Sequence, residues 1–286
     1  MNKHFSLLAA GLIALGGLAS CNKSAKNAQD ASAQDTAKPV ELTQTSFSKE
    51  DNLLNMNLTA LVPTGNDAAS TAMRDTLLAT LQQELTTWIV GDDKPQEPVK
   101  DTKDVDALAQ KCYDSNRAQM LKDQKEFGIS YTAPYEWQFT LDTLTQTDRY
   151  IVFDARGYQY MGGAHGGVFG RGAITFSKAD GQPFTRWFTD PNNTKLHQMM
   201  LDGIAQYFSQ SEGKAVSVDS LADYLLVKPS EVVLPVESPR PTPDGLGFSY
   251  GQYEIAAYAA GMPSFILPYD QLLPYLSDEA KELLGL

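Results

Sequence analysis

The chain has 286 residues, 42% hydrophobic and 20% charged, so it is long enough to fold as one large or two ordinary domains with a sizeable core. Its formal net charge of -12, with no block of lysine or arginine, argues against nucleic acid as a partner, because phosphate binding needs a concentrated basic surface. Two cysteines and three histidines exclude most thiolate and imidazole metal sites. We therefore expect no cofactor and assign no metal ligand, and the sequence leaves open whether an ion is bound.

The first twenty residues carry the pattern of an export signal. A short basic segment precedes an apolar run over residues 5–18, which has the length of a signal-peptide core and is too short to span a bilayer comfortably. The run ends in Leu18-Ala19-Ser20-Cys21, which resembles the bacterial lipobox, where the signal is removed and the cysteine carries lipid such as palmitate. We predict a signal peptide over residues 1–20 and lipid attachment at Cys21. The alternative is an ordinary signal peptide with an incidental cysteine.

A flexible tether is expected after the lipid-bearing cysteine. Residues 22–39 contain no Val, Ile, Leu, Met or aromatic residue, so we assign residues 21–39 to a tether with an average reach of about 25 Å. Asn22 stands where many enteric lipoproteins of the inner membrane have Asp. We therefore expect a cell-envelope lipoprotein of the outer membrane of a Gram-negative bacterium, held to the lipid membrane by its N-terminus. Whether it faces the periplasm or the exterior stays open.

Hydrophobic periodicity predicts the elements of the first half. Alternation of apolar and polar side chains indicates half-buried strands, and apolar residues at three- and four-residue steps indicate amphipathic helices. Alternating segments on both sides of a turn are typical of a hairpin. On these criteria we predict a strand at 54–62, helices at 68–90 and 102–126, and a hairpin of strands at 137–141 and 151–155.

The second half is richer in strands, with one strong amphipathic helix. That helix covers residues 196–208, and Asn192, Asn193 or Thr194 supplies its cap. Short apolar runs predict strands, and two short helical patterns close the chain. The predicted strands lie at 173–177, 232–236, 246–250 and 265–269, and the closing helices at 269–276 and 278–284.

Helices and strands are segregated rather than strictly alternating, which favours an α+β fold with largely antiparallel sheets. We predict two α+β subdomains, each packed by one or two amphipathic helices. The glycine-rich stretch near residues 161–172 is the clearest break, so we place an N-terminal subdomain at 40–165 and a C-terminal subdomain at 166–286. The sequence leaves open whether the two share one sheet.

The chain lacks a coherent catalytic set. Gly247 to Gly251 fit the G-x-S-x-G nucleophile elbow, but that motif needs a histidine later in the chain, and His165 and His197 both lie upstream of Ser249. Neither H-E-x-x-H nor C-x-x-C is present. We therefore favour a non-catalytic protein and name no catalytic residue.

Two stretches have the composition of a binding surface. Residues 161–167 are rich in glycine, which lets a ligand or another chain approach closely, and residues 250–275 hold five of the thirteen tyrosines, whose rings suit protein and sugar contacts. The structural alternatives are a tight strand connection anchored by a hydrogen-bonded His165 and tyrosines packed in the core. The candidate ligand-binding residues are Tyr158, Tyr160, Gly162, Gly163, His165, Gly166, Tyr250, Tyr253, Glu254 and Tyr258.

Taken together, these stretches resemble one known family. The segments that carry the resemblance are Tyr158 to Gly166, Thr175-Phe176 through Asp180-Gly181 to Trp187-Phe188, Gly245 to Gly261, and Pro268-Tyr269. Their motifs resemble the extracytoplasmic domain shared by RsiV anti-sigma factors and the N-terminal region of PdaC deacetylases, of the DUF3298/DUF4163 type. The resemblance covers most of residues 45–276.

The resemblance implies a sensing or binding domain at the cell envelope. In RsiV-like proteins this domain recognises lysozyme, while a cytoplasmic segment holds a sigma factor. Neither a cytoplasmic segment nor the deacetylase domain is expected here. The resemblance therefore implies a non-catalytic lipoprotein that binds an extracytoplasmic protein or cell-wall glycan, with a lysozyme-like enzyme or a peptidoglycan fragment as candidates. The alternative is an envelope enzyme that acts on peptidoglycan or another polysaccharide through unidentified carboxylates.

Overall fold

A computed structural model describes residues 38–89, 97–163 and 165–286. The predicted signal peptide, Cys21 and all but the end of the predicted tether lie outside the described residues. Within the described part, no helix is both long and apolar enough to cross a lipid bilayer.

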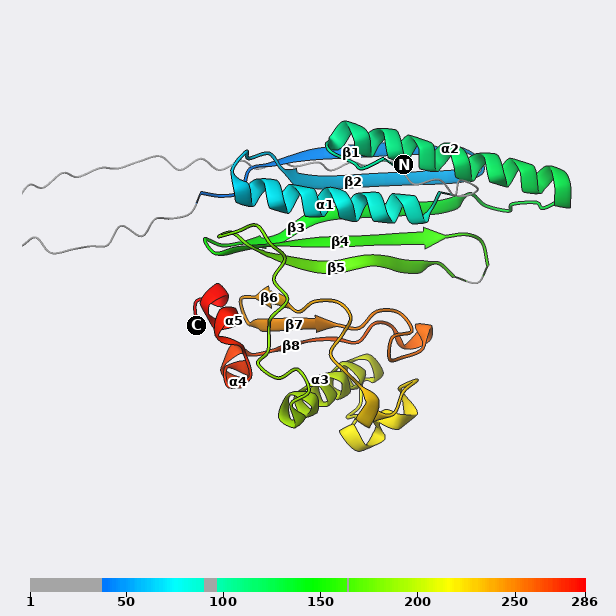
Figure 1. The fold of residues 1–286 in the computed structure, drawn as a ribbon. Coiled ribbons are helices and arrows are strands. Elements are labelled where there is room, and N and C mark those ends of the chain that lie inside the picture. Colours follow the sequence, from blue (N-terminus) through cyan, green and yellow to red (C-terminus); the bar gives the residue numbers. More distant parts are fainter. Residues whose placement is uncertain (1–37, 90–96, 164) are drawn as a thin grey trace, which may run out of the picture. The chain divides into compact units, whose positions relative to one another are not determined.

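The first half of the described chain contains a five-stranded sheet (Figure 1). Its strands are neighbours in sequence order, and every pair is antiparallel except β2 and β3, which run parallel. A parallel pair needs a long crossover, and here two helices provide it. The strands are β1 (Leu42–Glu50), β2 (Leu54–Pro63), β3 (Tyr135–Gln146), β4 (Tyr150–Tyr160) and β5 (Gly167–Ser177).

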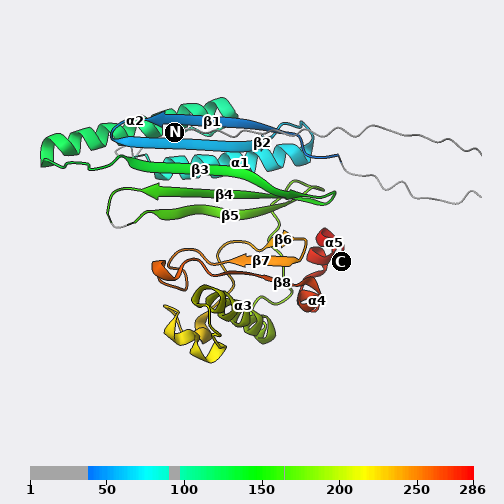
Figure 2. The same cartoon turned by 180° about the vertical axis from the view of Figure 1, so that it is seen from behind.

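The two crossover helices, α1 (Ala68–Thr87) and α2 (Thr102–Phe127), lie on one face of this sheet (Figures 1 and 2). Asp67 caps α1 by accepting the N–H of Ser70, and Asp101 caps α2. The predicted positions of both helices are confirmed, because their apolar spacing is a local property of the sequence. Their buried faces pack against the alternate side chains of the strands.

The glycine-rich stretch turns out to connect two paired strands. It joins β4 to β5, with Gly162 and Gly163 at φ of 78° and 99°, so the boundary placed between residues 165 and 166 falls inside a hairpin. The first sheet therefore continues to Ser177, and the predicted strand at 173–177 belongs to it. Glycine was needed here for a tight connection with positive φ, not for a linker between subdomains.

The second half contains a separate three-stranded antiparallel sheet with helix α3 packed against it (Figure 1). Its core gathers apolar side chains of α3, the sheet and the C-terminal helices into two buried clusters. The α+β class is thus confirmed. The elements are α3 (Thr194–Glu212), the 3-10 helices η1 (Val218–Asp223), η2 (Pro229–Glu231) and η3 (Tyr258–Ala260), strands β6 (Arg240–Thr242), β7 (Gly245–Ser249) and β8 (Ser264–Leu267), and helices α4 (Tyr269–Leu272) and α5 (Asp278–Leu284).

One predicted strand is wrong. Residues 232–236 form no strand: Val232 follows η2, and the N–H of Val236 donates to the carboxylate of Glu254 rather than to a neighbouring strand. Pro235 interrupts the run and removes one donor that a ladder would use. The helix predicted at 269–276 is also shorter, since α4 is a single turn.

The strand register separates the start of the described chain from the β4–β5 hairpin tip. Leu42 pairs with Pro63 at one end of the sheet, whereas Leu54 pairs with Tyr135 at the other. The tip at 161–166 lies at this second end, because Tyr160 is paired with Glu136. An eleven-residue strand such as β4 spans about 35 Å, so the two ends are well apart.

Asp51 ties the β1–β2 turn to α2. Its carboxylate accepts the N–H groups of Leu53 and Leu54 at 2.8 and 2.9 Å and pairs with the guanidinium of Arg117. Burial acts to raise the pKa of this carboxyl, but Arg117 and the two N–H donors outweigh burial and lower the pKa from 3.8 to about 2. The ionised carboxylate therefore stabilises the fold.

A lowered pKa in the folded state makes this contribution depend on pH. It is fully present above a pH of about 4 and is lost as the pH falls to about 2. We expect Asp51→Asn to reduce the free energy of unfolding at neutral pH by about 1 kcal/mol. The variant should also lose less stability than the natural chain on acidification, as measured by urea unfolding. Glu126→Gln, at an exposed carboxylate on α2, is the matched control. An acid-induced loss in Asp51→Asn equal to that of the natural chain would contradict the assignment.

Candidate functional site

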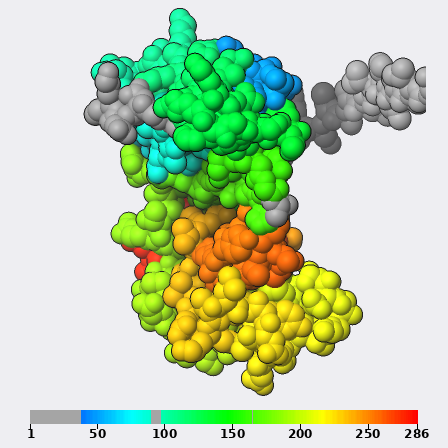
Figure 3. All heavy atoms as spheres, turned by 90° about the vertical axis from the view of Figure 1, so that its right-hand side faces the viewer, coloured from blue at the N-terminus to red at the C-terminus, as the bar shows by residue number. Residues whose placement is uncertain are grey.

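An aromatic cluster forms where the β4–β5 hairpin meets the loop after β7. The imidazole of His165 stacks on the ring of Tyr258 with centroids 3.7 Å apart and planes at 17°. The hydroxyl of Tyr253 lies 3.4 Å from Nε2 of His165, and its ring lies 6.1 Å from that of Tyr258. In Figure 3 the green atoms of the hairpin meet the orange atoms of this loop. We call His165, Tyr253 and Tyr258 the aromatic cluster.

The hairpin tip is shaped by its tyrosines and glycines. The hydroxyl of Tyr160 donates to the carbonyl of Gly163 at 3.1 Å across the turn. A Cβ on Gly166 would lie 2.3 Å from the hydroxyl oxygen of Tyr158, so only glycine allows this close approach. The carbonyl of Gly166 lies 2.9 Å from Nδ1 of His165. These contacts hold the imidazole toward the loop.

The loop after β7 is held by hydrogen bonds of the buried Tyr250 and the partly exposed Glu254. Tyr250 is fully buried, its hydroxyl donates to the carbonyl of Val233 at 2.7 Å, and burial raises its pKa. Glu254 accepts the N–H of Gly251 at 2.7 Å and the N–H of Val236 at 2.8 Å. Both side chains therefore brace the loop through bonds to backbone groups. Among the candidate residues, these two lie away from the aromatic cluster.

Tyr253 combines an unusual backbone with an exposed ring. Its φ is 62°, and among the described residues it alone has a positive φ without being glycine. Its side chain is 54% exposed. A bulky residue in the left-handed region costs about 1–2 kcal/mol, which the surrounding loop must offset. Such strain together with an exposed ring is typical of functional sites.

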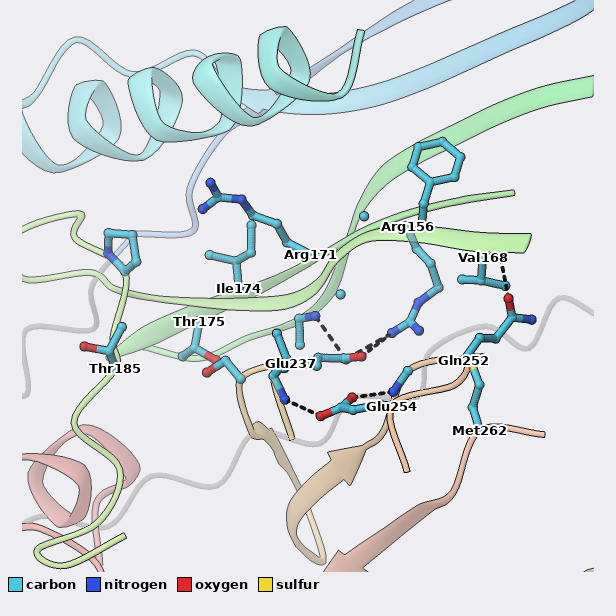
Figure 4. A pocket seen from close by; sticks show the side chains of 18 of the residues that line it. Arg156, Val168, Arg171, Ile174, Thr175, Thr185, Glu237, Gln252, Glu254 and Met262 are labelled. Carbon is cyan, nitrogen blue, oxygen red and sulfur yellow. Dashed lines mark hydrogen bonds and ion pairs between the residues drawn. The ribbon is translucent and has the colours of Figure 1, made fainter. Parts of the chain in front are cut away.

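A cleft of about 600 Å³ lies beside the aromatic cluster, between the edge of β5 and the loops at 236–238 and 251–254 (Figure 4). Gln252, next to Tyr253, accepts the N–H of Val168 on β5 at 2.9 Å. The hydroxyl of Thr175 is buried and has no hydrogen-bond partner, and Thr175 lines this cleft. The wall of the cleft mixes apolar side chains such as Ile174 and Met262 with charged ones such as Arg171 and Glu237, while the Thr175 hydroxyl lies behind its surface.

An ion pair closes the base of the cleft. The guanidinium of Arg156 lies 3.0 Å from Oε1 of Glu237, which also accepts the N–H of Ala173 at 3.1 Å (Figure 4). Arg156 pairs with Asp154 as well, at 3.2 Å. Burial raises the pKa of Glu237, although the charge of Arg156 opposes this. We call Arg156, Glu237 and the Ala173 N–H the junction.

Glycines at a β-bulge make room for the junction. The β4–β5 register shifts between Ala155 and Arg156, opposite Gly170 and Gly172. Gly172 has a φ of 66°, and a Cβ there would lie 2.2 Å from the carboxyl carbon of Glu237. Arg156, Glu237 and the cleft were not predicted from the sequence. Two glycines flanking Arg171 inside a strand were the available signal for a bulge.

The carboxylates that line the cleft already hold structural hydrogen bonds. Glu237 serves the junction, and Glu254 braces the loop. Among the described residues, no group of three or more His, Cys, Asp or Glu side chains could hold a metal ion. The cleft and the neighbouring aromatic cluster thus present aromatic rings and hydrogen-bonding groups.

Two family models match this chain, and each covers one of the two segments that form the aromatic cluster. Residues 48–167 match the family described as deacetylase PdaC, and residues 239–270 match a protein family of unknown function, DUF3298. His165 lies in the first match, and Tyr253 and Tyr258 lie in the second. The aromatic cluster is therefore built from both matched regions.

Solved structures share this fold. A DUF3298 family member from Bacteroides fragilis is 15% identical with a TM-score of 0.60, covering 85% of this chain and 96% of that one. A DUF3298 family protein from Pseudomonas aeruginosa is 12% identical with a TM-score of 0.55, covering 86% of this chain and 98% of that one. No curated protein matches the chain. These findings confirm the resemblance to the PdaC and DUF3298 type of domain, a family of unknown function.

A side chain at position 172 would be destabilising for two reasons, its clash with Glu237 and the positive φ of the backbone, and the two effects can be measured separately. We expect Gly172→Ala to reduce the free energy of unfolding by about 2–3 kcal/mol, because it adds strain and displaces Glu237 from the junction. Gly128→Ala is the matched control: Gly128 also has a φ of 66°, but a Cβ there would meet nothing within 4 Å. The control should lose about 1 kcal/mol. If urea unfolding showed the same loss of stability in Gly172→Ala and Gly128→Ala, the clash with Glu237 would contribute nothing to the loss at position 172.

With tyrosine at position 253, the folded protein should be less stable than with glycine there. We expect Tyr253→Gly to raise the free energy of unfolding by about 1 kcal/mol, because glycine adopts a positive φ without steric cost. Tyr258→Ala should lower it, because the stack on His165 is lost. Thermal and urea unfolding of both variants test this, and a destabilised Tyr253→Gly would mean that the ring contributes more to packing than its backbone costs.

Proposed function

We propose that this protein is a non-catalytic cell-envelope lipoprotein whose RsiV-like domain binds an extracytoplasmic protein or cell-wall glycan, with a lysozyme-like enzyme as the first candidate. The observation that carries the proposal is the aromatic cluster, with Tyr253 exposed in a strained backbone beside a cleft. Rigid tyrosine rings supply large contact areas at low entropic cost, which suits both protein and sugar partners.

Further exposed apolar side chains at the same end of the sheet support a macromolecular partner. Phe127 is 71% exposed, and Ile129 and Met161 are also exposed. Phe127 and Ile129 precede β3, whose first residue, Tyr135, would lie 3.5 Å from a Cβ on Gly162 of the hairpin tip. Apolar side chains gathered at one end are typical of an interaction surface.

The position of the cluster suits a lipid-anchored receptor. The described chain starts beside the end of the sheet at which Leu42 pairs with Pro63, opposite the hairpin tip. The aromatic cluster and the first described residues therefore lie at opposite ends of the sheet, which leaves the cluster clear of the point where the expected tether begins. The net charge of -12 would attract a basic partner, so association should weaken as salt rises.

The test is binding of the full chain, purified in detergent, to a panel of lysozymes and soluble peptidoglycan fragments at low and moderate salt. We expect saturable, salt-sensitive binding to at least one member. Tyr253→Ala and Tyr258→Ala should each weaken it about tenfold or more, or about 1.4 kcal/mol. Isothermal titration calorimetry measures both effects.

The matched control is Leu273→Ala, which removes an exposed apolar side chain next to α4. It should bind with unchanged affinity. Unfolding curves must show that the tyrosine variants remain folded. Absence of binding to every member would refute the lysozyme and peptidoglycan candidates, and binding that survives both tyrosine substitutions would place the binding surface elsewhere.

A further inference from the structure

Arg240 differs from the other arginines of this protein. All seven arginines lie in the described part of the chain, and six of them donate hydrogen bonds or pair with a carboxylate. Arg240 makes neither kind of contact with any described residue, although its side chain is partly buried. Because its guanidinium N–H groups have no acceptor in the described chain, Arg240 is available to donate to an anionic ligand.

The backbone opposite Arg240 accommodates its side chain. Arg240 on β6 pairs with Gly247 on β7. A Cβ on Gly247 would lie 3.0 Å from Nε and 3.1 Å from Cγ of Arg240, so the side chain lies flat across the strand where glycine leaves room. The position of the guanidinium is therefore set by the sheet itself.

The guanidinium lines a pocket of about 350 Å³ between α3 and β8. Gln206 and Gln210, one turn apart on α3, contribute amides that have no hydrogen-bond partner among the described residues, and Ser264 contributes a hydroxyl. No carboxylate lines the pocket. Glu237 is near enough to act on Arg240 by its charge, but it is held by Arg156 and the N–H of Ala173.

We propose that this pocket binds a carboxylate carried on a short organic group, the chemistry shared by a free small acid and the C-terminus of a peptide. The planar guanidinium of Arg240 would donate two parallel hydrogen bonds to the carboxylate, and the amides of Gln206 and Gln210 would donate further ones. Phe265 and Ile266 form an apolar wall for the attached carbon atoms. A single positive group in a chain of net charge -12 suits a monoanion better than a phosphate dianion. The site shares no residue with the aromatic cluster and does not depend on the proposed function.

The test is calorimetric titration of the full chain with four probes: acetate, N-acetyl-dialanine, its C-terminal amide and inorganic phosphate. We expect the free dipeptide acid to bind and its amide to bind at least tenfold more weakly. Arg240→Gln should weaken binding of the acid at least tenfold, and Arg240→Lys should restore only part of it, because lysine keeps the charge but not the planar fork. Gly247→Ala should also weaken binding, because the added methyl displaces the guanidinium.

Arg186→Gln is the matched control, since Arg186 is an exposed arginine paired with Glu279. It should bind like the natural chain, and unfolding curves must show that each variant is folded. Acetate binding as tightly as the dipeptide would support the site and assign it to small acids; preference for the dipeptide would assign it to peptide termini. Any of four results would overturn the proposal. Phosphate could bind more strongly than either acid, or the acid and its amide could bind equally. Binding could be unchanged in Arg240→Gln, or no probe could bind at tens of millimolar.

Discussion

The junction between Arg156, Glu237 and the N–H of Ala173 is the contact on which the arrangement of the site depends. It joins β4 and β5 to the segment that leads into the second sheet, across 81 residues of sequence. Buried charges are tolerated only when they are paired and hydrogen-bonded, so the two elements must meet in a narrow range of positions. Gly172 provides the space in which the carboxylate of Glu237 fits.

The same edge of β5 positions the aromatic cluster. Once Glu237 meets Ala173, Gln252 can accept the N–H of Val168 further along the strand. Tyr253, next to Gln252, and Tyr258 then reach His165 at the hairpin tip. Glu237 and Gln252 also occupy outward donors of an edge strand that would otherwise invite pairing with another chain. One edge therefore takes part both in the assembly of the fold and in the placement of the aromatic cluster.

The tyrosines of the loop divide into two roles according to burial. Buried Tyr250 and the carboxylate of the partly exposed Glu254 stabilise the loop through bonds to backbone groups. That bracing permits the strained, exposed conformation of Tyr253. Strain of this kind persists only when the surrounding structure over-determines it. On another surface, the absence of a side chain at Gly247 leaves room for Arg240, whose guanidinium has no acceptor in the described chain.

The sequence by itself determined the elements whose signals are local. The apolar spacing of α1, α2 and α3 and the alternation in β2, β3 and β4 placed these elements, and composition singled out His165 and the loop tyrosines. Strand β1 was missed because an exposed edge strand lacks clear alternation, and residues 232–236 were assigned wrongly because an apolar run does not reveal whether a strand partner exists. Tertiary structure decided the parallel pairing of β2 with β3, the junction and the cleft. These depend on contacts between distant residues, such as Arg156 with Glu237, and periodicity within a short window carries no information about such pairs.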